Sequence, residues 1–211
     1  MKGLILNNLY SVEKSIKSST FIAIAAVILL ILTQNSAALR VAAMLPFLLI
    51  PPQAFEVLKH DAMSGWNKFE MTLPVKRRKI VQSKYLTFLL LFFMSVLLTF
   101  VLFYIANLFI MLPFTNVFNF LLRGMGAVLC IAAIIYPMTY ILGTEKSDTI
   151  MISSMGFTFG MFFLVFILLQ MIVGTSEGFD EIFSVTFFVA SIFLFIVSYL
   201  ISNIVYTKKE F

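Results

Sequence analysis

Six long apolar segments, separated by short polar ones, constrain the fold of this chain more than any other feature of its sequence. A helix needs about 17 to 25 mainly apolar residues to cross a bilayer, and inside lipid every backbone polar group must be hydrogen-bonded. Apolar residues make up 61% of the chain, against roughly 45 to 50% in soluble domains. The sequence therefore predicts an all-α, polytopic membrane protein, with six transmembrane helices over residues 17–33, 39–58, 85–111, 124–142, 150–173 and 182–206.

The second apolar segment contains three prolines, Pro46, Pro51 and Pro52. Proline has no backbone N–H and clashes with the preceding helical turn, so we expect this span to be kinked or broken. Glu56, near its end, has two open interpretations. It is either a carboxylate for ion coupling or part of an interfacial ion pair with residues 59–60.

The first 18 residues have the pattern of an amphipathic helix. The apolar positions on one helical face are Ile5, Leu9, Val12 and Ile16. A helix of this kind lies in the membrane interface. We therefore predict two parts, an amphipathic interfacial helix over residues 1–18 and a six-helix transmembrane domain over residues 19–211. A flexible amino-terminal tail is the alternative.

The sequence also predicts three features of the later spans and the segments between them. Residues 113–123 are predicted to be an external connection, and Gly143 is predicted to cap the end of the fourth span. The fifth span carries Gly156 and Gly160 in a GxxxG arrangement, which lets another backbone approach closely. That neighbour belongs either to the same chain or to a second subunit.

Basic residues are distributed unevenly between the two sides. If the six spans alternate in direction, thirteen of the fifteen Lys and Arg residues fall on the side of the termini, and Arg40 and Arg123 fall on the other. Cytoplasmic loops carry an excess of Lys and Arg, so both termini are predicted to be cytoplasmic. Because these residues flank apolar spans, the net charge of +5 indicates orientation in a membrane and no nucleic-acid partner.

Residues 61–85 form the one long polar segment between apolar spans. Trp66, Phe69 and Leu73 recur at a spacing that places all three on one face of a short helix. Pro74 is predicted to end this helix and to begin the next one. An aromatic face on a helix outside the membrane is typical of a surface that binds a partner.

Two details of this segment remain open. Asp61 or Ser64 is predicted to cap the start of the short helix. The basic run at residues 76–79 belongs either to a partner-binding surface or to the topology signal that sits among anionic lipid headgroups.

The sequence lacks the motifs of common catalytic and cofactor sites. It contains no GxxxxGK[ST] phosphate loop, HExxH, CxxC or GxSxG. The single cysteine, Cys130, lies in an apolar run and is expected to serve packing, and the single histidine, His60, is expected to be solvated. We therefore expect no catalytic, cofactor-binding or metal-binding residue, and a chain that is not an enzyme.

A longer motif covers residues 61–86. Its positions are Asp61, Gly65, Trp66, Phe69, Leu73, Pro74, Val75, Arg77, Ile80, Val81, Lys84, Tyr85 and Leu86. It resembles the signature of six-span permease subunits of bacterial ATP-binding-cassette exporters of the type 2 class (ABC-2), which reads approximately as an acidic residue, W-x-x-[FY], then LPV-x-R-x-x-[IV]V-x-x-[KR]Y[LIV]. Among these, the chain is most similar to the short membrane subunits of phenol-soluble modulin exporters.

The resemblance implies a site and partners. Residues 61–85 would be the coupling segment that docks on a separate ATPase, which binds the ATP and magnesium, and this chain would bind no cofactor. The residues that would carry docking are Asp61, Gly65, Trp66, Phe69, Leu73, Pro74 and Arg77. A second permease subunit, of the same chain or a paralogue, would complete the translocation path in the bacterial plasma membrane. The expected cargo is an amphipathic peptide such as a phenol-soluble modulin.

Other functions remain open from the sequence. A permease that expels bacteriocins or other antimicrobial peptides for self-protection has the same features. An ion-coupled secondary transporter needs a titratable group in the membrane, for which Glu56 is the candidate. A scaffold or pore that transports nothing by itself is a third alternative.

Overall fold

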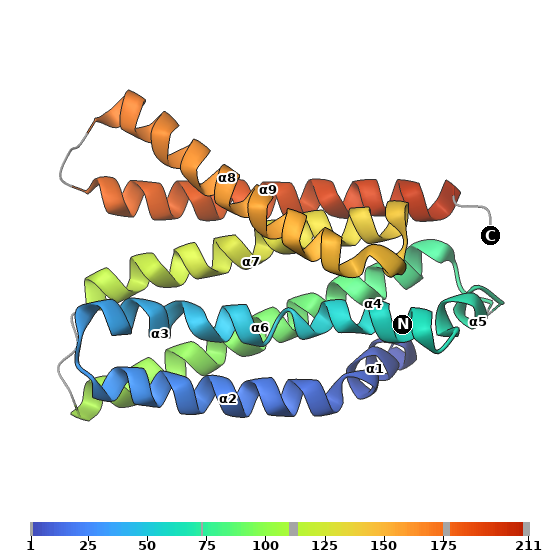
Figure 1. The fold of residues 1–211 in the computed structure, drawn as a ribbon, viewed down its shortest axis with the longest axis horizontal. Helices are drawn as coiled ribbons and strands as arrows, with labels where there is room; N and C mark the ends of the chain where they lie inside the picture. Colours follow the sequence, from blue (N-terminus) through green and yellow to red (C-terminus); the bar gives the residue numbers. More distant parts are fainter. Residues whose placement is uncertain (1, 73, 110–113, 175–177, 209–211) are drawn as a thin grey trace.

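The computed structural model describes residues 2–72, 74–109, 114–174 and 178–208, and every regular element in these ranges is helical. Six segments of this part of the chain are long and apolar enough to cross a membrane, which confirms the predicted fold class. The spans lie side by side in one elongated bundle (Figure 1). The short helix α5, the helix α1 and the C-terminal end of α9 lie at the same end of this bundle, called here the α5 end (Figure 1).

The spans follow the chain in order. The first is α2, the second is divided into α3 and α4, and the remaining four are α6, α7, α8 and α9. The bounds are α1 (Lys2–Ser11), α2 (Glu13–Leu32), α3 (Ser36–Leu49), α4 (Gln53–Met63), α5 (Trp66–Thr72), α6 (Arg77–Phe109), α7 (Phe114–Leu142), the 3₁₀ turn η1 (Thr144–Lys146), α8 (Ser147–Val173) and α9 (Phe179–Lys208).

The second span is broken at its prolines, as the sequence predicts. Residues 50–52 separate α3 from α4. The backbone N–H of Ile50 donates to the carbonyl of Pro46 at 3.0 Å, and that of Gln53 donates to the carbonyl of Ile50 at 3.2 Å. The backbone donors on both sides of the break are therefore satisfied by nearby carbonyls.

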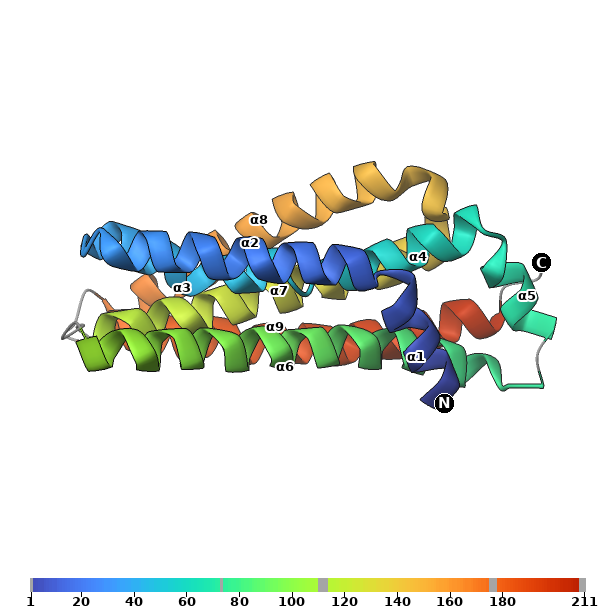
Figure 2. The same ribbon diagram turned by 90° about the horizontal axis from the view of Figure 1, so that it is seen from below.

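The amino-terminal segment is two helices instead of one. Val12 has non-helical backbone angles, φ −119° and ψ 17°, and separates α1 from α2. The first span thus begins at Glu13, earlier than predicted. The buried positions of α1 and the break are Leu4, Asn8 and Val12, because α1 crosses the end of the bundle against α4 and α6 (Figure 2).

The start of α7 corrects another prediction. Helix begins at Phe114, although residues 113–123 were predicted to be an external connection. Val117 and Leu121, one helical turn apart, are buried in the core, so tertiary packing extends the helix through the predicted connection. At the other end, Gly143 has a φ of +84°, and its N–H donates to the carbonyl of Thr139 at 3.0 Å, as expected for a C-cap.

An aromatic cluster joins the spans near the α5 end. The rings of Tyr85 in α6 and Tyr136 in α7 are stacked with centroids 4.3 Å apart, and Phe88 in α6 stacks on Phe55 in α4 at 5.7 Å. The Tyr85 ring also lies 5.3 Å from Phe195 in α9. Contacts of this kind are worth about 0.5 to 1.5 kcal/mol beyond their buried area, so the cluster links four helices.

Candidate functional site

A sharp turn between α4 and α5 positions the predicted coupling segment. Gly65 has a φ of +71°, a left-handed conformation that glycine adopts without steric cost. Its N–H donates to the carbonyl of Ala62 at 3.3 Å, and its own carbonyl accepts from the N–H of Phe69 at 3.3 Å. The turn therefore ends one helix and starts the next within two residues of backbone, and α5 projects at the end of the bundle (Figure 1).

Neither predicted cap of α5 has that role. Asp61 lies inside α4, and its carboxylate bonds to Lys84 in α6. The Ser64 hydroxyl donates to the carbonyl of His60 at 2.8 Å. The physical reason is that α4 continues to Met63, so both residues belong to the end of α4 and not to the start of α5.

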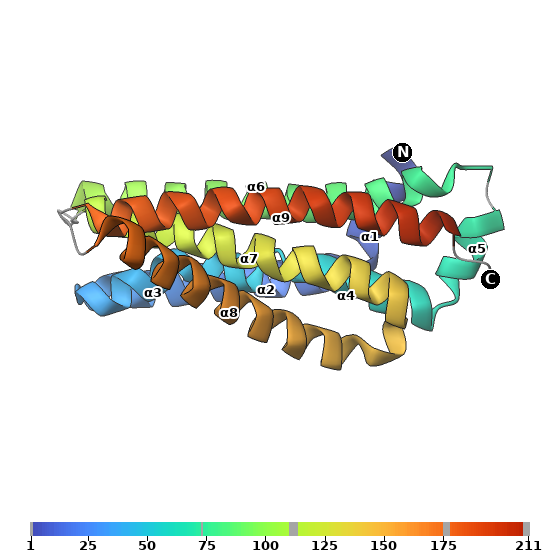
Figure 3. The same ribbon diagram turned by 90° about the horizontal axis from the view of Figure 1, so that it is seen from above.

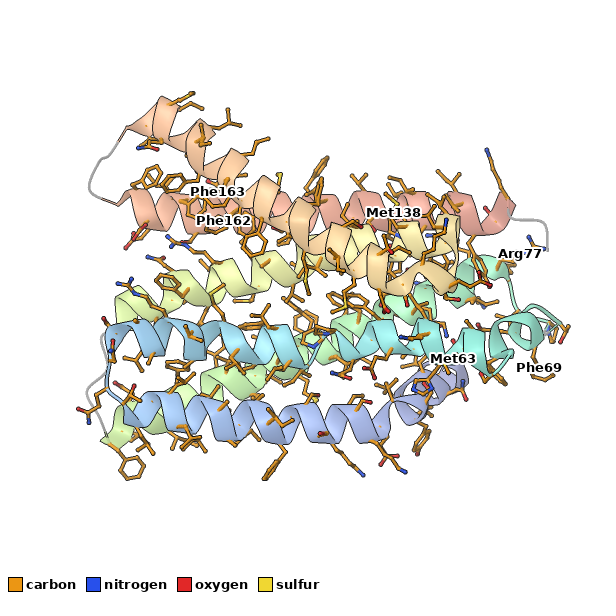
Figure 4. All side chains as sticks on the ribbon, in the orientation of Figure 1. Met63, Phe69, Arg77, Met138, Phe162 and Phe163 are labelled. Carbon is orange, nitrogen blue, oxygen red and sulfur yellow. The ribbon has the colours of Figure 1, made fainter. Side chains whose placement is uncertain are left out.

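The turn from α4 into α5, called here the α4–α5 corner, has an apolar outer surface. The Phe69 side chain in α5 is 53% exposed and Met63 at the end of α4 is 78% exposed, both at the α5 end (Figure 4). The ring of Trp66 lies 5.2 Å from that of Phe69 and is half-buried. The Trp66 Nε1–H has no acceptor among the described residues.

Four basic residues, 76–79, follow α5 and are called here the basic collar. The side chains of residues 76–79 are exposed, and α6 begins at Arg77, later than the predicted start at Pro74. The Arg77 guanidinium donates to the carbonyl of Thr207 near the end of α9 at 3.2 Å (Figure 4). The collar is therefore tied to the last span, and Pro74 is exposed between it and α5.

A cluster of charged side chains lies inside the corner. The Lys84 ammonium in α6 donates to the Asp61 carboxylate in α4 and to the Asn8 amide oxygen in α1, the latter at 2.8 Å. A second carboxylate, Glu70 in α5, has one oxygen 4.0 Å from the same ammonium. All four side chains are buried, and Glu70 is only 2% exposed. One lysine thus holds groups from three other helices.

The charge of this cluster is unbalanced. Two carboxylates, Asp61 and Glu70, share the single ammonium of Lys84, and the second Glu70 oxygen has no hydrogen-bond donor among the described residues. Burial raises the pKa of the Glu70 carboxyl above its ordinary value; the charge of Lys84 opposes this, and the charge of Asp61 adds to it. Glu70 is therefore the weakly held member of the cluster.

Two cavities adjoin the corner. One of about 120 Å³ is lined by Glu70 and Lys84 together with side chains of α7 and α9. Another of about 310 Å³ lies between α4, α7 and the start of α8, with apolar walls and with Glu56 and Asp148 in its lining. The first lies on the α5 side of the helix break, and the second also reaches the break and the end of α3. Both are large enough to hold water or part of a ligand.

Glu56 does not form the predicted ion pair. Lys59 pairs with Asp148 at 3.6 Å, and His60 makes no ion pair in the described chain. Glu56 is exposed, one turn earlier on α4, and also makes no ion pair there. The ion-pair interpretation of Glu56 is wrong because the approach of α8 brings Asp148, a residue distant in sequence, closer to Lys59 than Glu56 is.

The GxxxG glycines do not pack against any of the described residues of this chain. α8 crosses the outside of the bundle obliquely (Figures 1 and 3). Gly156 and Gly160 are exposed, and a Cβ atom at either would meet nothing within 4 Å. The buried face of α8 instead carries Ser154 and Thr158. The sequence left open whether their neighbour belongs to the same chain or to a second subunit; no described helix of the same chain packs against them.

The structure brings most of the predicted site residues to one corner. Gly65, Trp66, Phe69, Pro74 and Arg77 lie at or near the surface there, whereas Asp61 faces inward. Leu73 lies outside the described residues. Sequence reasoning missed Asn8 and Glu70, because nothing in their spacing marks a buried polar residue. Lys84 was within the quoted motif, yet its ionic role was not foreseen.

Comparison with known proteins identifies the family of this chain. A family model described as ABC-2 family transporter protein matches residues 3–207, nearly the whole chain. No curated protein and no solved structure matches the chain. The match extends over α1, all six spans and the charged corner around α5. This chain therefore belongs to the ABC-2 family of transporter membrane proteins.

Proposed function

We propose that this chain is the permease subunit of an ATP-driven exporter in a bacterial plasma membrane, with the α5 end in the cytoplasm. Family membership supports a transport component that works with an ATP-binding-cassette ATPase. The orientation is supported by the basic residues: Arg40 lies in the second turn of α3 and Arg123 in the third turn of α7, and both helices start at the end opposite α5. Cytoplasmic loops carry the excess of Lys and Arg.

The ATPase docks on the outer surface of the α4–α5 corner. The observation that carries this proposal is Phe69, a large aromatic residue 53% exposed on a helix that projects from the bundle. Aromatic and arginine residues dominate binding energy at interfaces, so Phe69, Trp66 and Arg77 provide most of the affinity. Gly65 and Pro74 shape the corner, Met63 adds apolar surface, and Asp61 holds the corner from inside. Leu73 also belongs to the proposed docking set, on the sequence motif alone.

Transport then follows from movement of this corner. Two permease chains face each other, with Gly156 and Gly160 on α8 as contacts between them, and each chain is bound to an ATPase. ATP and magnesium bind to the ATPase, and this chain performs no catalysis. Closure of the ATPases on ATP moves the α4–α5 corners, and the spans change from inward-facing to outward-facing.

The cargo is an amphipathic peptide, such as a phenol-soluble modulin. The cavity of about 310 Å³ between α4, α7 and α8 supports this, because it combines apolar walls with the charged groups Glu56, Lys59 and Asp148. An amphipathic peptide lies in the membrane interface, which is the level of this cavity when the α5 end is cytoplasmic.

Co-purification tests the docking surface. Each ATP-binding-cassette ATPase of the host is expressed in turn with the wild-type chain, with Phe69→Ala and with Phe193→Ala. The control removes an aromatic ring that is 66% exposed in the middle of α9, away from the corner. We expect one ATPase to bind the wild type and the control, and Phe69→Ala to lose most of it. Equal recovery with all three chains would contradict docking through Phe69.

A further inference from the structure

We propose that Lys84 is the positioning residue that transmits movement of α5 to the spans, and that its ammonium moves from Asp61 towards Glu70 when α5 is displaced. The inference rests on the proposed function, because a partner ATPase supplies the displacement. It concerns a different surface, however, since these three side chains are buried and do not form the docking face.

Lys84 lies where side chains from several helices meet. Its side chain contacts Asn8 of α1 and Asp61 of α4, and Glu70 of α5 is the next nearest carboxylate. The Asn8 amide in turn donates to Thr87 Oγ1 at 3.2 Å, one turn further along α6. Displacement of any of these helices changes the surroundings of the same ammonium.

Glu70 is poised to gain a bond. An ammonium has three N–H donors, and two of those of Lys84 are used by Asn8 and Asp61. Glu70 Oε2 is 4.0 Å away, beyond hydrogen-bond distance. A shift of α5 by about 1 Å would bring it to the roughly 2.8 Å of a charge-assisted hydrogen bond. The cavity of about 120 Å³ beside Glu70 and Lys84 gives the two side chains space to approach each other.

The other side of Lys84 faces the membrane spans. Its backbone carbonyl accepts from the Tyr136 hydroxyl of α7 at 3.2 Å. The adjacent residue, Tyr85, stacks on Tyr136, and its hydroxyl lies 2.8 Å from both Ser198 and Ser202 of α9. A change in position at Lys84 is therefore passed directly to α7 and α9, two of the spans that form the core.

The Glu70→Gln variant tests this exchange. Glutamine has nearly the same shape, and it removes a buried charge that lacks a full partner, so the fold is retained. The variant and the cognate ATPase are placed in vesicles, and cargo export, ATP hydrolysis and ATPase co-purification are measured. We expect normal docking and hydrolysis, with cargo moved per ATP reduced by about tenfold, since one state loses a charge-assisted hydrogen bond. Glu13→Gln, in an exposed pair with Lys17, is the matched control and should behave as wild type.

The outcomes separate the two proposals. A wild-type ratio of cargo to ATP in Glu70→Gln would overturn the role of Lys84, as would loss of ATPase binding, which would place Glu70 in the docking surface. Failure of the wild-type chain to bind any ATPase would instead overturn the proposed function. If Glu70→Gln does not fold, Glu70→Asp decides, because it keeps the carboxylate and shortens the side chain by one methylene, which places the carboxylate farther from Lys84. It should dock the ATPase and move less cargo per ATP; wild-type coupling would contradict the inference.

Discussion

Gly126 of α7 lies directly against the ring of Phe187 of α9. A Cβ atom at Gly126 would lie 2.8 Å from two carbons of that ring and 3.2 Å from Ser191 Oγ. The Phe187 side chain is fully buried, so its ring has no open space to move into. This glycine therefore sets how closely α7, the most buried span, approaches α9.

Replacement of this glycine should weaken the bundle. Gly126→Ala is expected to lower the free energy of unfolding by about 1 to 3 kcal/mol, because the added methyl group forces the α7–α9 contact apart. Thermal unfolding of the purified protein in detergent measures the effect. Gly3→Ala in α1 is the control, since its Cβ would meet nothing within 4 Å. Equal melting temperatures for both variants would show that the contact is not tight.

The Tyr85 hydroxyl should contribute measurably to packing between α6 and α9. It lies 2.8 Å from Ser198 Oγ and 2.8 Å from Ser202 Oγ. Tyr85→Phe removes both contacts and keeps the ring, so we expect a loss of about 0.5 to 1.5 kcal/mol in unfolding free energy. Tyr104→Phe, on an exposed part of the same helix, should change nothing. Equal unfolding free energies of Tyr85→Phe and wild type would contradict a stabilising hydrogen bond between α6 and α9.

Glu70 should make stability depend on pH. A carboxyl whose pKa is raised in the folded state stabilises that state most below its ordinary pKa, here 4.5, and this contribution is lost as the pH rises towards the raised value. We therefore expect the melting temperature of the wild type to fall relative to that of Glu70→Gln as the pH increases from about 4.5 to 8. Lys84 and Asp61 are present in both proteins, so the difference isolates Glu70. A difference that does not vary with pH would contradict a raised pKa.

Contact between two permease chains through α8 should depend on small residues. Gly160→Leu adds a large side chain to an exposed position, and it should reduce the dimer fraction in lipid nanodiscs, measured by crosslinking, at least several-fold. The monomer fold should be unaffected. Phe193→Leu, on an exposed face of α9, is the control for a change in lipid contact. An unchanged dimer fraction in Gly160→Leu would move the contact to another helix.

The spans and the break at the prolines were accessible from the sequence because they depend on local properties. Apolar length determines membrane crossing, and the missing N–H of Pro51 and Pro52 determines where α3 ends. Tertiary packing determined the helix bounds that the sequence did not predict. Burial of Val117 and Leu121 extends α7 through the predicted connection, and the contact of α1 with α6 breaks the first helix at Val12.

The candidate site was predicted only on its outer side. The spacing of Trp66 and Phe69 places both rings on one face, and the structure brings these rings together at 5.2 Å. The inner side depends on pairs far apart in the sequence: Lys84 and Asn8 are 76 residues apart, and Lys84 and Asp61 are 23 apart. The spacing of residues within one helix does not predict a contact between side chains that lie on different helices.

The most direct test uses Trp66, the one tryptophan in the sequence, as a reporter in α5. The chain is labelled with 5-fluorotryptophan, placed in nanodiscs and titrated with the ATPase that co-purifies with it, while the single ¹⁹F resonance is recorded. If the α4–α5 corner is the docking surface, this resonance shifts to a new position at saturation, and Phe69→Ala abolishes the shift at the same ATPase concentrations. An unchanged resonance while the ATPase sediments with the nanodiscs would contradict the account.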